Sequence, residues 1–356
     1  MQGLIPSLFK KFKKKYFGLL SLCFISIITF LSIFVYLIAP DSSQNANQMH
    51  LSIHSKPPGF KVHMLIQPIV TKNKQNVLDR LFFGNKYPEK QTPILSYSIE
   101  NEKISYVLYN SLKTDFLYYS DDLSPSLKPY IEEKVFYLGT DKFGRDFLSR
   151  ILVGSRISLF IGFIAVSISL FLGLFLGSLA GYFGGRVDDF IMWLINVTWS
   201  IPTLLLVIAI TLALGKGFWQ VFIAVGLTMW VEVARVVRGE VMSVKQQQYI
   251  TAARALGFSD FRIIFRHIIP NIMTPVIVIS AANFAASILI ESGLSFLGIG
   301  AQPPMSSWGA MIKAHYNDII LGQPYLALIP GLCIMSVVMA FMLIGNSLRD
   351  VLDVKI

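Results

Sequence analysis

Cysteine is scarce in this chain of 356 residues, which contains only Cys23 and Cys333. Both lie inside apolar runs, so we expect them to act as small buried hydrophobic side chains. Two cysteines in such positions do not form a disulfide framework, which excludes the class of small disulfide-stabilised domains.

Charged residues are also few, at 15% of the chain against 54% hydrophobic residues, a balance typical of a polytopic membrane protein. About 20 residues of helix span the hydrocarbon core of a bilayer. Five runs free of charge are long enough, and a short fourth run suffices if Glu232 to Ala234 enter the inner boundary. We predict an all-α membrane protein with six transmembrane helices, from the runs Tyr16–Ala39, Ile157–Gly185, Phe190–Gly215, Gly217–Val231, Ile268–Ile290 and Ile319–Leu348.

Asp, Glu and Lys are missing from the interior of these runs, and no internal repeat is apparent. An ion-coupled transporter that works alone would need membrane-embedded carboxylates and an inverted repeat, so the sequence argues against that class. Gly139 and Gly144 have a spacing similar to that of a phosphate-binding loop, but Arg145-Asp146 replaces the required Lys-Ser/Thr pair. No nucleophile is paired with a base, so we expect no cofactor and no enzymatic activity.

Basic residues give a formal net charge of +10, and their placement indicates membrane orientation, with no nucleic-acid partner. They cluster before the first run and in the loop 232–267, whereas the short loops on the opposite side hold only Lys216 and Lys313. By the positive-inside rule, both termini are predicted to be cytoplasmic. The first run is too long for a signal peptide, so residues 1–40 are expected to form a basic tail and a retained first membrane helix.

Residues 41–138 form a polar segment between the first two runs and are therefore predicted to be extracytoplasmic. Alternating side chains predict a strand at Gly59–Ile66, and Ile94–Ile99 with Ile104–Tyr109 predict a hairpin, so we expect a small β-rich insert. His50, His54 and His63 could form a metal site, but no cysteine or carboxylate pattern supports it, and we interpret them as incidental.

The segment from Leu138 to Arg156 precedes the second run and combines apolar and charged positions. Its apolar stripe and its two ion pairs at a spacing of four predict a helix in the outer membrane interface: Phe143, Phe147, Ile151 and Leu152, with Asp141/Arg145 and Asp146/Arg150.

Small and polar residues mark two further places inside the runs. Gly173, Gly177 and Gly181, at steps of four, predict a face that packs closely on another helix. Pro202 predicts a bend in the third run, where flanking hydroxyls can satisfy the backbone carbonyl that the proline frees. The polar side chains around it are expected to face the bundle interior, where the bend, with Trp199 beside it, either lines a translocation path or serves packing alone: Asn196, Thr198, Ser200 and Thr203. Asn283, in the fifth run, is either a contact between helices or a residue of the path.

Residues 246–271, which we call the elbow, lie between two apolar runs but have the pattern of two short helices. The first is expected to end at a left-handed cap on Gly257, after side chains at helical spacing: Tyr249, Ala252, Ala253 and Leu256. Ser259 is predicted to cap the second helix, whose apolar face is Ile263, Ile264 and Ile268. A folded connector of this length indicates a docking partner, although an amphipathic helix on the membrane surface without a partner would have a similar pattern.

The elbow resembles the "EAA" loop of permease subunits of ATP-binding-cassette (ABC) importers. The resemblance lies in the string AARALG, from Ala252 to Gly257, followed by the Ile269-Pro270 pair thirteen positions after the glycine. Thr251 stands where the family has its leading glutamate. Two further strings, GTDKFGRDFLSR and ESGLSFLGIGAQPPMSSWG, resemble the C-type permeases of dipeptide and oligopeptide importers.

This resemblance covers the first run and Leu138 to the end of the chain. It implies the six-helix permease fold of type I importers, in which residues 139–356 form the transmembrane domain with its cytoplasmic coupling loop at 246–271. It implies a cell inner membrane protein that pairs with a B-type permease subunit, two ABC ATPase subunits and an extracytoplasmic substrate-binding protein, and that contacts membrane lipid. The ATPase-coupling surface would be Tyr249, Ala252, Ala253, Arg254, Leu256 and Gly257. The transported solute would be a di- or oligopeptide. A nickel complex or another small solute remains an alternative, as does an ion-coupled transporter.

Overall fold

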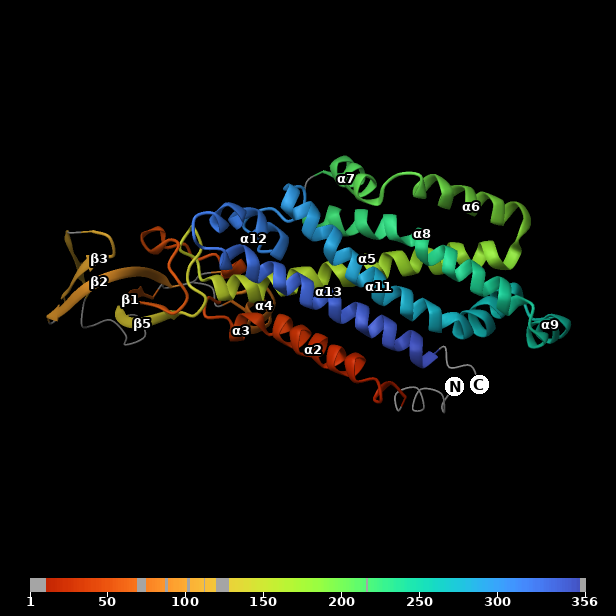
Figure 1. Ribbon diagram of the computed structural model, residues 1–356. Coiled ribbons are helices and arrows are strands. Elements are labelled where there is room, and N and C mark those ends of the chain that lie inside the picture. The colour runs from red at the N-terminus through yellow and green to blue at the C-terminus, as the bar shows by residue number, and fades with distance from the viewer. Residues whose placement is uncertain are drawn as a thin grey trace.

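The helices of this chain form an elongated bundle with a β-sheet at one end and the elbow at the other (Figure 1). We call these the sheet end and the elbow end. Lys216 and the first ten residues, whose charges were used to predict the orientation in the membrane, lie outside the residues that the structure describes. The computed structural model describes residues 11–68, 75–86, 89–100, 103–111, 113–119, 128–215 and 217–352, without the side chain of residue 352.

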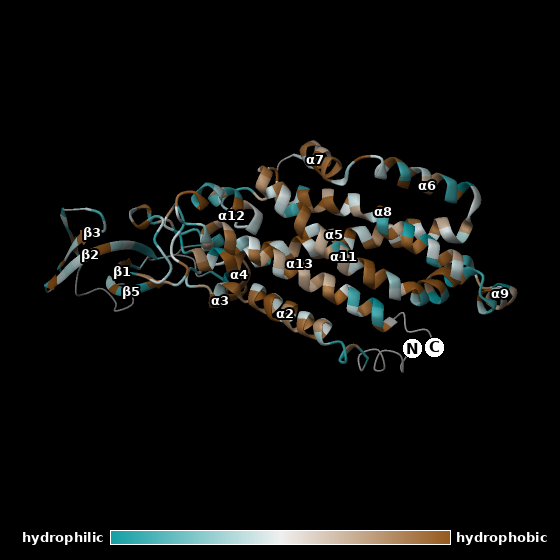
Figure 2. Cartoon of the chain, in the orientation of Figure 1, coloured by the Kyte–Doolittle hydropathy of each residue, from teal (hydrophilic) through white to brown (hydrophobic). Residues whose placement is uncertain are grey.

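Five helical stretches among the described residues are long and apolar enough to cross a membrane: α2 (Tyr16–Ile33), α5 (Phe147–Phe183), α8 (Phe218–Lys245), Asp260–Leu297 and α13 (Tyr325–Leu352). The fourth of these includes α11 (Ile269–Leu297). Two shorter helices, α6 (Gly185–Trp199) and α7 (Thr203–Leu214), meet at a bend of 92° and make a sixth crossing if they are counted together. Figure 2 shows that apolar residues, in brown, predominate along the middle of the long helices.

Helices α5 and α8 pack closely because the small residues of α5 face α8. A Cβ added at Gly173 would overlap Val233, and one added at Gly177 would lie 2.5 Å from the carbonyl oxygen of Ala234. At Gly181 the added Cβ would lie 2.7 Å from the carbonyl oxygen of Arg238. The predicted role of this stripe in helix packing is confirmed.

Two helices extend beyond their apolar runs. Helix α8 continues to Lys245, well past the short fourth run, because its charged side chains find partners: Arg238 forms a bidentate ion pair with Asp188, at 2.5 and 2.6 Å. Helix α11 continues to Leu297 and so includes Glu291, which is completely buried and accepts a hydrogen bond from Ser295 at 2.6 Å. The prediction that no carboxylate lies inside a span is therefore wrong at Glu291.

The two cysteines are free and less buried than predicted. Cys23 is exposed on α2, and Cys333 is partly exposed on α13. The prediction of burial is wrong for Cys23 in this chain, because apolar side chains on the outside of a membrane helix face lipid or another subunit.

Residues 60–136 include a five-stranded antiparallel sheet in the order β4-β3-β2-β1-β5. Its strands are β1 (Phe60–Gln67), β2 (Lys90–Glu100), β3 (Lys103–Leu108), β4 (Thr114–Tyr118) and β5 (Tyr130–Phe136). Val62, Met64 and Ile66 alternate along β1 and pack against Ile53 and Phe136. Two short helices, α3 (Val35–Ile38) and α4 (Val77–Phe83), lie where the sheet domain meets the bundle.

Residues 138–146, before α5, form a loop, so the first half of the predicted interfacial helix is wrong, whereas residues 147–156 are helical as the start of α5. Gly139 and Gly144 adopt positive φ angles of 75° and 70°, and a side chain at Gly144 would overlap the backbone of His50. Helix α5 starts only at Phe147, capped by Asp146, which accepts a hydrogen bond from the backbone N–H of Ser149. From there it runs without interruption to Phe183.

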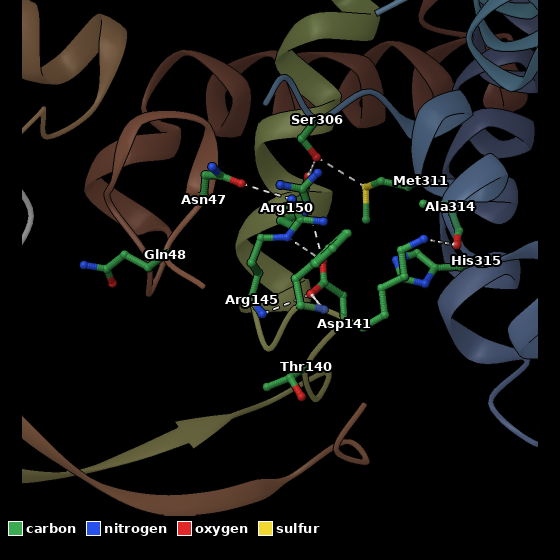
Figure 3. Close-up of polar contacts among 12 residues, drawn as sticks. Asn47, Gln48, Thr140, Asp141, Arg145, Arg150, Ser306, Met311, Ala314 and His315 are labelled. Carbon is green, nitrogen blue, oxygen red and sulfur yellow. Dashed lines mark hydrogen bonds and ion pairs between the residues drawn. The ribbon is translucent and has the colours of Figure 1, made fainter. Parts of the chain in front are cut away.

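Asp141 organises this loop (Figure 3). Its carboxylate is completely buried and accepts hydrogen bonds from the backbone N–H groups of Phe143 and Arg145 and, at 2.7 Å, from Nε of Arg145. Nε of Arg150 lies 3.7 Å away. The predicted Asp141/Arg145 pair is therefore present, but Arg150 pairs with Asp141 and not with Asp146.

The sheet end is joined to the bundle by hydrogen bonds from distant parts of the chain. The indole N–H of Trp308, at the start of α12 (Trp308–His315), donates to the carbonyl of Ile151, and the hydroxyl of Tyr325 donates to the carbonyl of Lys56. His50 is buried beside this loop, and burial, with a smaller contribution from Lys134, lowers its pKa to about 4. The described residues contain no group of three side chains that could hold a metal ion.

Candidate functional site

The elbow folds as two short helices joined at a glycine. Helix α9 (Gln248–Ala255) ends in a Schellman motif, in which the N–H of Gly257 bonds to the carbonyl of Arg254 and the N–H of Phe258 bonds to that of Ala253. Gly257 has a φ of +76°, which a residue with a Cβ adopts only with strain. The left-handed cap predicted from the sequence is confirmed.

Five of the six predicted coupling residues lie on the exposed side of the elbow. Tyr249 is 44% exposed and Leu256 is 74% exposed, and the side chains of Ala252 and Arg254, with Gly257, are exposed as well. Ala253 differs, because it is only 5% exposed and packs with Ile250 into the core of the elbow end. Its inclusion in the surface was wrong, since at helical spacing it shares the inner face of α9 with Ile250.

The second half of the elbow continues without a break into the membrane. Helix α10 (Asp260–Ile263) is followed by a π-helix at Ile264–Ile268 and then by α11. Ile263, Ile264 and Ile268 are buried, as predicted, whereas Ser259 occupies the N-cap position without a capping hydrogen bond.

Sequence reasoning missed two aromatic residues on the exposed side of the elbow. Phe261 and Phe265 are exposed and stacked, with ring centroids 5.9 Å apart. Their spacing of four in a short polar loop was the available signal.

Tyr182, in the last turn of α5, connects the parts of the elbow. Its hydroxyl donates to Asp260 at 2.5 Å and accepts from Arg254 at 3.5 Å, and its backbone carbonyl accepts from Lys245. The hydrogen bond to Tyr182 raises the pKa of the exposed Arg254 guanidinium. Tyr182 therefore joins α9 and α10 to the ends of α5 and α8, a connection that no local sequence signal indicates.

The bent pair of α6 and α7 holds the predicted path residues of the third span. Pro202 lies at the break, and the hydroxyls of Thr198 and Ser200 donate to the carbonyls of Leu194 and Val197. Both of these carbonyls lie within α6. The carbonyl of Thr198, four residues before Pro202, accepts instead from the backbone N–H of Ile201 at 3.4 Å, so a backbone group and not a hydroxyl fills the place that the proline leaves open.

These path residues do not face the interior of this chain, which corrects the prediction. Asn196, Trp199, Pro202 and Thr203 are all exposed. The guanidinium of Arg235 lies 3.6 Å from the ring centroid of Trp199. The polar groups are placed on an open side of the bundle, where lipid, a cavity or another subunit can meet them.

Asn283 lies apart from this group, on α11. Its side chain is 2% exposed, and its Nδ2 has no hydrogen-bond partner among the described residues. The structure therefore places Asn283 in the packed interior of the bundle.

Comparisons with known proteins agree with this arrangement. Residues 173–356, which include the elbow, match the family described as "Binding-protein-dependent transport system inner membrane component". The glutathione transport system permease protein GsiD of Pectobacterium atrosepticum is 42% identical over 220 residues, covering 62% of this chain and 73% of that protein. The dipeptide transport system permease protein DppC of Alkalihalophilus pseudofirmus is 42% identical over 219 residues, covering 62% and 72%. The oligopeptide transport system permease protein OppC of Bacillus subtilis is 37% identical over 223 residues, covering 63% and 73%. Since the family match spans more than half of the chain, this protein belongs to the inner membrane components of binding-protein-dependent transport systems.

Proposed function

We propose that this chain is one permease subunit of an ATP-driven importer of short peptides in the cell inner membrane. Its partners are a related B-type permease subunit, two ATPase subunits and an extracytoplasmic substrate-binding protein. The names of its relatives, which transport glutathione, dipeptides and oligopeptides, support a peptide as the solute. Hydrolysis of ATP takes place in the partner subunits.

The exposed elbow is the observation that carries this proposal. A folded, partly aromatic surface that is fixed to the ends of three long helices is suited to receive force from a second protein. Tyr249, Ala252, Arg254, Leu256 and Gly257 form the docking surface, while Ala253 holds α9 to the bundle.

Six transmembrane segments follow if α6 and α7 are one broken span. The elbow end is then cytoplasmic, with both termini, and the sheet domain is extracytoplasmic. The Lys15–Asp350 ion pair, at 2.8 Å, supports a common side for the start of α2 and the end of α13. Asn196, Trp199, Pro202 and Thr203 line the path at the contact with the partner permease.

ATP binding closes the ATPase pair and displaces the elbow. Because Tyr182 donates to Asp260 and accepts from Lys245, α5, α8 and α11 move with the elbow between inward-facing and outward-facing arrangements. ATP can shift these two arrangements only by its difference in affinity for them.

Cysteine crosslinking tests the docking surface. Cysteines at Arg254 and Leu256 are expected to crosslink to an ATPase subunit in native membranes, whereas a cysteine at the buried Ala253 serves as the matched control and should not. If neither exposed position forms a crosslink to an ATPase subunit, the assignment of the elbow as the docking surface is refuted.

Substitution of Gly257 tests coupling. A Cβ at Gly257 meets no atom within 4 Å, so Gly257→Val strains only the left-handed backbone, by about 1–2 kcal/mol. We expect loss of peptide uptake with normal membrane insertion. Gly59→Val is the control, because Gly59 has a φ of +79° and equally open surroundings but lies in the sheet domain. Normal uptake by the Gly257 variant would remove the coupling role.

Energy and solute dependence separate the remaining alternatives. Uptake that persists after ATP depletion but stops when the proton gradient is dissipated would identify an ion-coupled transporter, for which Glu291 is the buried carboxylate. Uptake of nickel in place of peptides would keep the architecture and change the solute.

A further inference from the structure

A cavity of about 650 Å³ opens between α8, α11 and α13 near the elbow end. Its volume lies within the range of small-molecule sites in proteins, about 300–1,000 Å³. Helices α11 and α13 approach closely at its edge, where a Cβ at Gly345 would lie 3.3 Å from Cβ of Ala281. Apolar residues such as Val236, Val278 and Ile279 form part of its wall, together with polar and charged residues.

Two opposite charges line this cavity without a partner. Glu240, on α8, and Arg349, on α13, both belong to its wall. Within the described residues, neither side chain has an ion pair or a hydrogen bond. Glu240 is half-buried and Arg349 is exposed, so both charges are accessible to a ligand of complementary charge.

Neutral polar groups line the same cavity. Asn271, Thr274 and Asn346 contribute amide and hydroxyl groups to the wall. Pro275, which lies inside α11, has no N–H, so the carbonyl of Asn271 loses its helical hydrogen bond and becomes a free acceptor. The cavity therefore offers donors and acceptors that match a peptide bond.

A second cavity shows that this charged lining is not a general property of the bundle. It has a volume of about 620 Å³ and lies between α11 and α13 nearer the sheet end. Its walls contain aliphatic, methionine and phenylalanine side chains with Ser292 and no charged residue, as expected for a surface that meets lipid or another helix.

We propose that the cavity at the elbow end binds a short zwitterionic peptide. Arg349 binds the terminal carboxylate, Glu240 binds the terminal ammonium group, and Asn271, Thr274 and Asn346 bind the backbone between them. The inference rests on the proposed function and adds a binding site for the transported solute within this subunit.

The same cavity is linked to the elbow through Asn271. Its Nδ2 donates to the hydroxyl of Tyr249, at 3.3 Å, and to the carbonyl of His267, at 2.6 Å. A peptide that competes for this amide changes a contact of the docking surface, so occupancy of the cavity reaches the ATPase side directly.

Photocrosslinking in the assembled transporter tests the proposal. A photoreactive amino acid at Val278, in the cavity wall, is placed in the complex of both permeases and ATPases in lipid nanodiscs without the binding protein. Radiolabelled alanyl-alanine should label this position, and unlabelled alanyl-alanine should compete about tenfold better than its N-acetyl or C-amide derivatives, because each derivative lacks one charge.

Two charge-removing variants give the specific signature. Glu240→Gln should abolish the discrimination against the N-acetyl derivative alone, and Arg349→Gln that against the C-amide alone. Asp189→Asn, an exposed substitution on α6, is the control and should change neither. Size-exclusion profiles show whether each variant folds. Glu240→Asp and Arg349→Lys, which keep the charges, should retain the discrimination between the peptide and its derivatives.

The outcomes separate this inference from the proposed function. Three results would overturn the binding site. The first is labelling at Val278 that excess unlabelled alanyl-alanine does not reduce, and the second is a crosslink from Val278 to the partner permease and not to the peptide. The third is unchanged discrimination against the N-acetyl and C-amide derivatives in both variants. ATP-dependent uptake of alanyl-alanine by cells that carry the wild-type transporter is measured independently. If uptake is present and the site is absent, the proposed function stands alone; if no peptide is taken up, the proposed function itself fails.

Discussion

The contact between α5 and α8 gives a quantitative test of the packing of the bundle. An added Cβ at Gly177 would lie 2.5 Å from the carbonyl oxygen of Ala234 and 2.8 Å from Cβ of Val237. Non-bonded atoms of these kinds prefer about 3.5 Å, so Gly177→Ala must separate the two helices locally by about 1 Å. Overpacking of this kind costs about 1–3 kcal/mol.

A second glycine supplies the reference. Gly239, on α8, has no atom within 4 Å of its added Cβ. Both Gly→Ala changes gain the same helix propensity, about 1 kcal/mol, so the difference between the two variants isolates the packing cost. Gly239→Ala should be neutral or stabilising, and Gly177→Ala should be less stable than it by about 1–3 kcal/mol.

The assay heats the purified protein in detergent and measures the fraction that remains monodisperse by size-exclusion chromatography. The midpoint for Gly177→Ala should lie about 2–6 °C below that for Gly239→Ala. Equal midpoints for the two variants would show that α5 and α8 do not touch at Gly177.

Two predictions concern the sheet end. Asp141→Asn should destabilise the protein by about 3–5 kcal/mol, seen as a lower heating midpoint, because it leaves the buried Arg145 without its counter-charge. Asp115→Asn, at a partly exposed position on the edge strand β4, is the control and should have little effect. An unchanged midpoint for Asp141→Asn would refute the buried pair. Since the pKa of His50 is lowered to about 4 from 6.5, its contribution to stability is complete above pH 6.5 and is lost as the pH falls to 4, by about 3 kcal/mol in total. His50→Gln should flatten this part of the pH–stability curve, and an unaltered pH dependence would contradict the burial.

Patterns within one element allowed much of this structure to be predicted. The apolar runs locate the long helices, the four-residue steps of Gly173, Gly177 and Gly181 identify a packing face, and Gly257 predicts the left-handed cap. Each depends only on residues close in sequence, whose spacing alone determines which of them share a face.

Features that depend on distant residues were not predictable. A spacing of four between Asp141 and Arg145 is compatible with a helix, but it also fits a turn, and packing against His50 at Gly144 selects the turn. Tyr182 connects α8, α9 and α10 only because the fold brings their ends together. The exposure of the polar groups around Pro202 likewise depends on what covers them, which is information that one chain does not contain.

Helix α5 is continuous over 37 residues, from Phe147, next to the loop of Asp141, to Phe183, next to Tyr182. At 1.5 Å per residue its length is about 55 Å. The hydrocarbon core of a bilayer is about 30 Å thick, so α5 is longer than the membrane interior and projects beyond it. A tilt of about 5° would carry one end about 5 Å sideways while the other end stays fixed. A small rotation of α5 about its end at Tyr182 would therefore displace the loop of Asp141, and the sheet domain attached to it, by several ångströms.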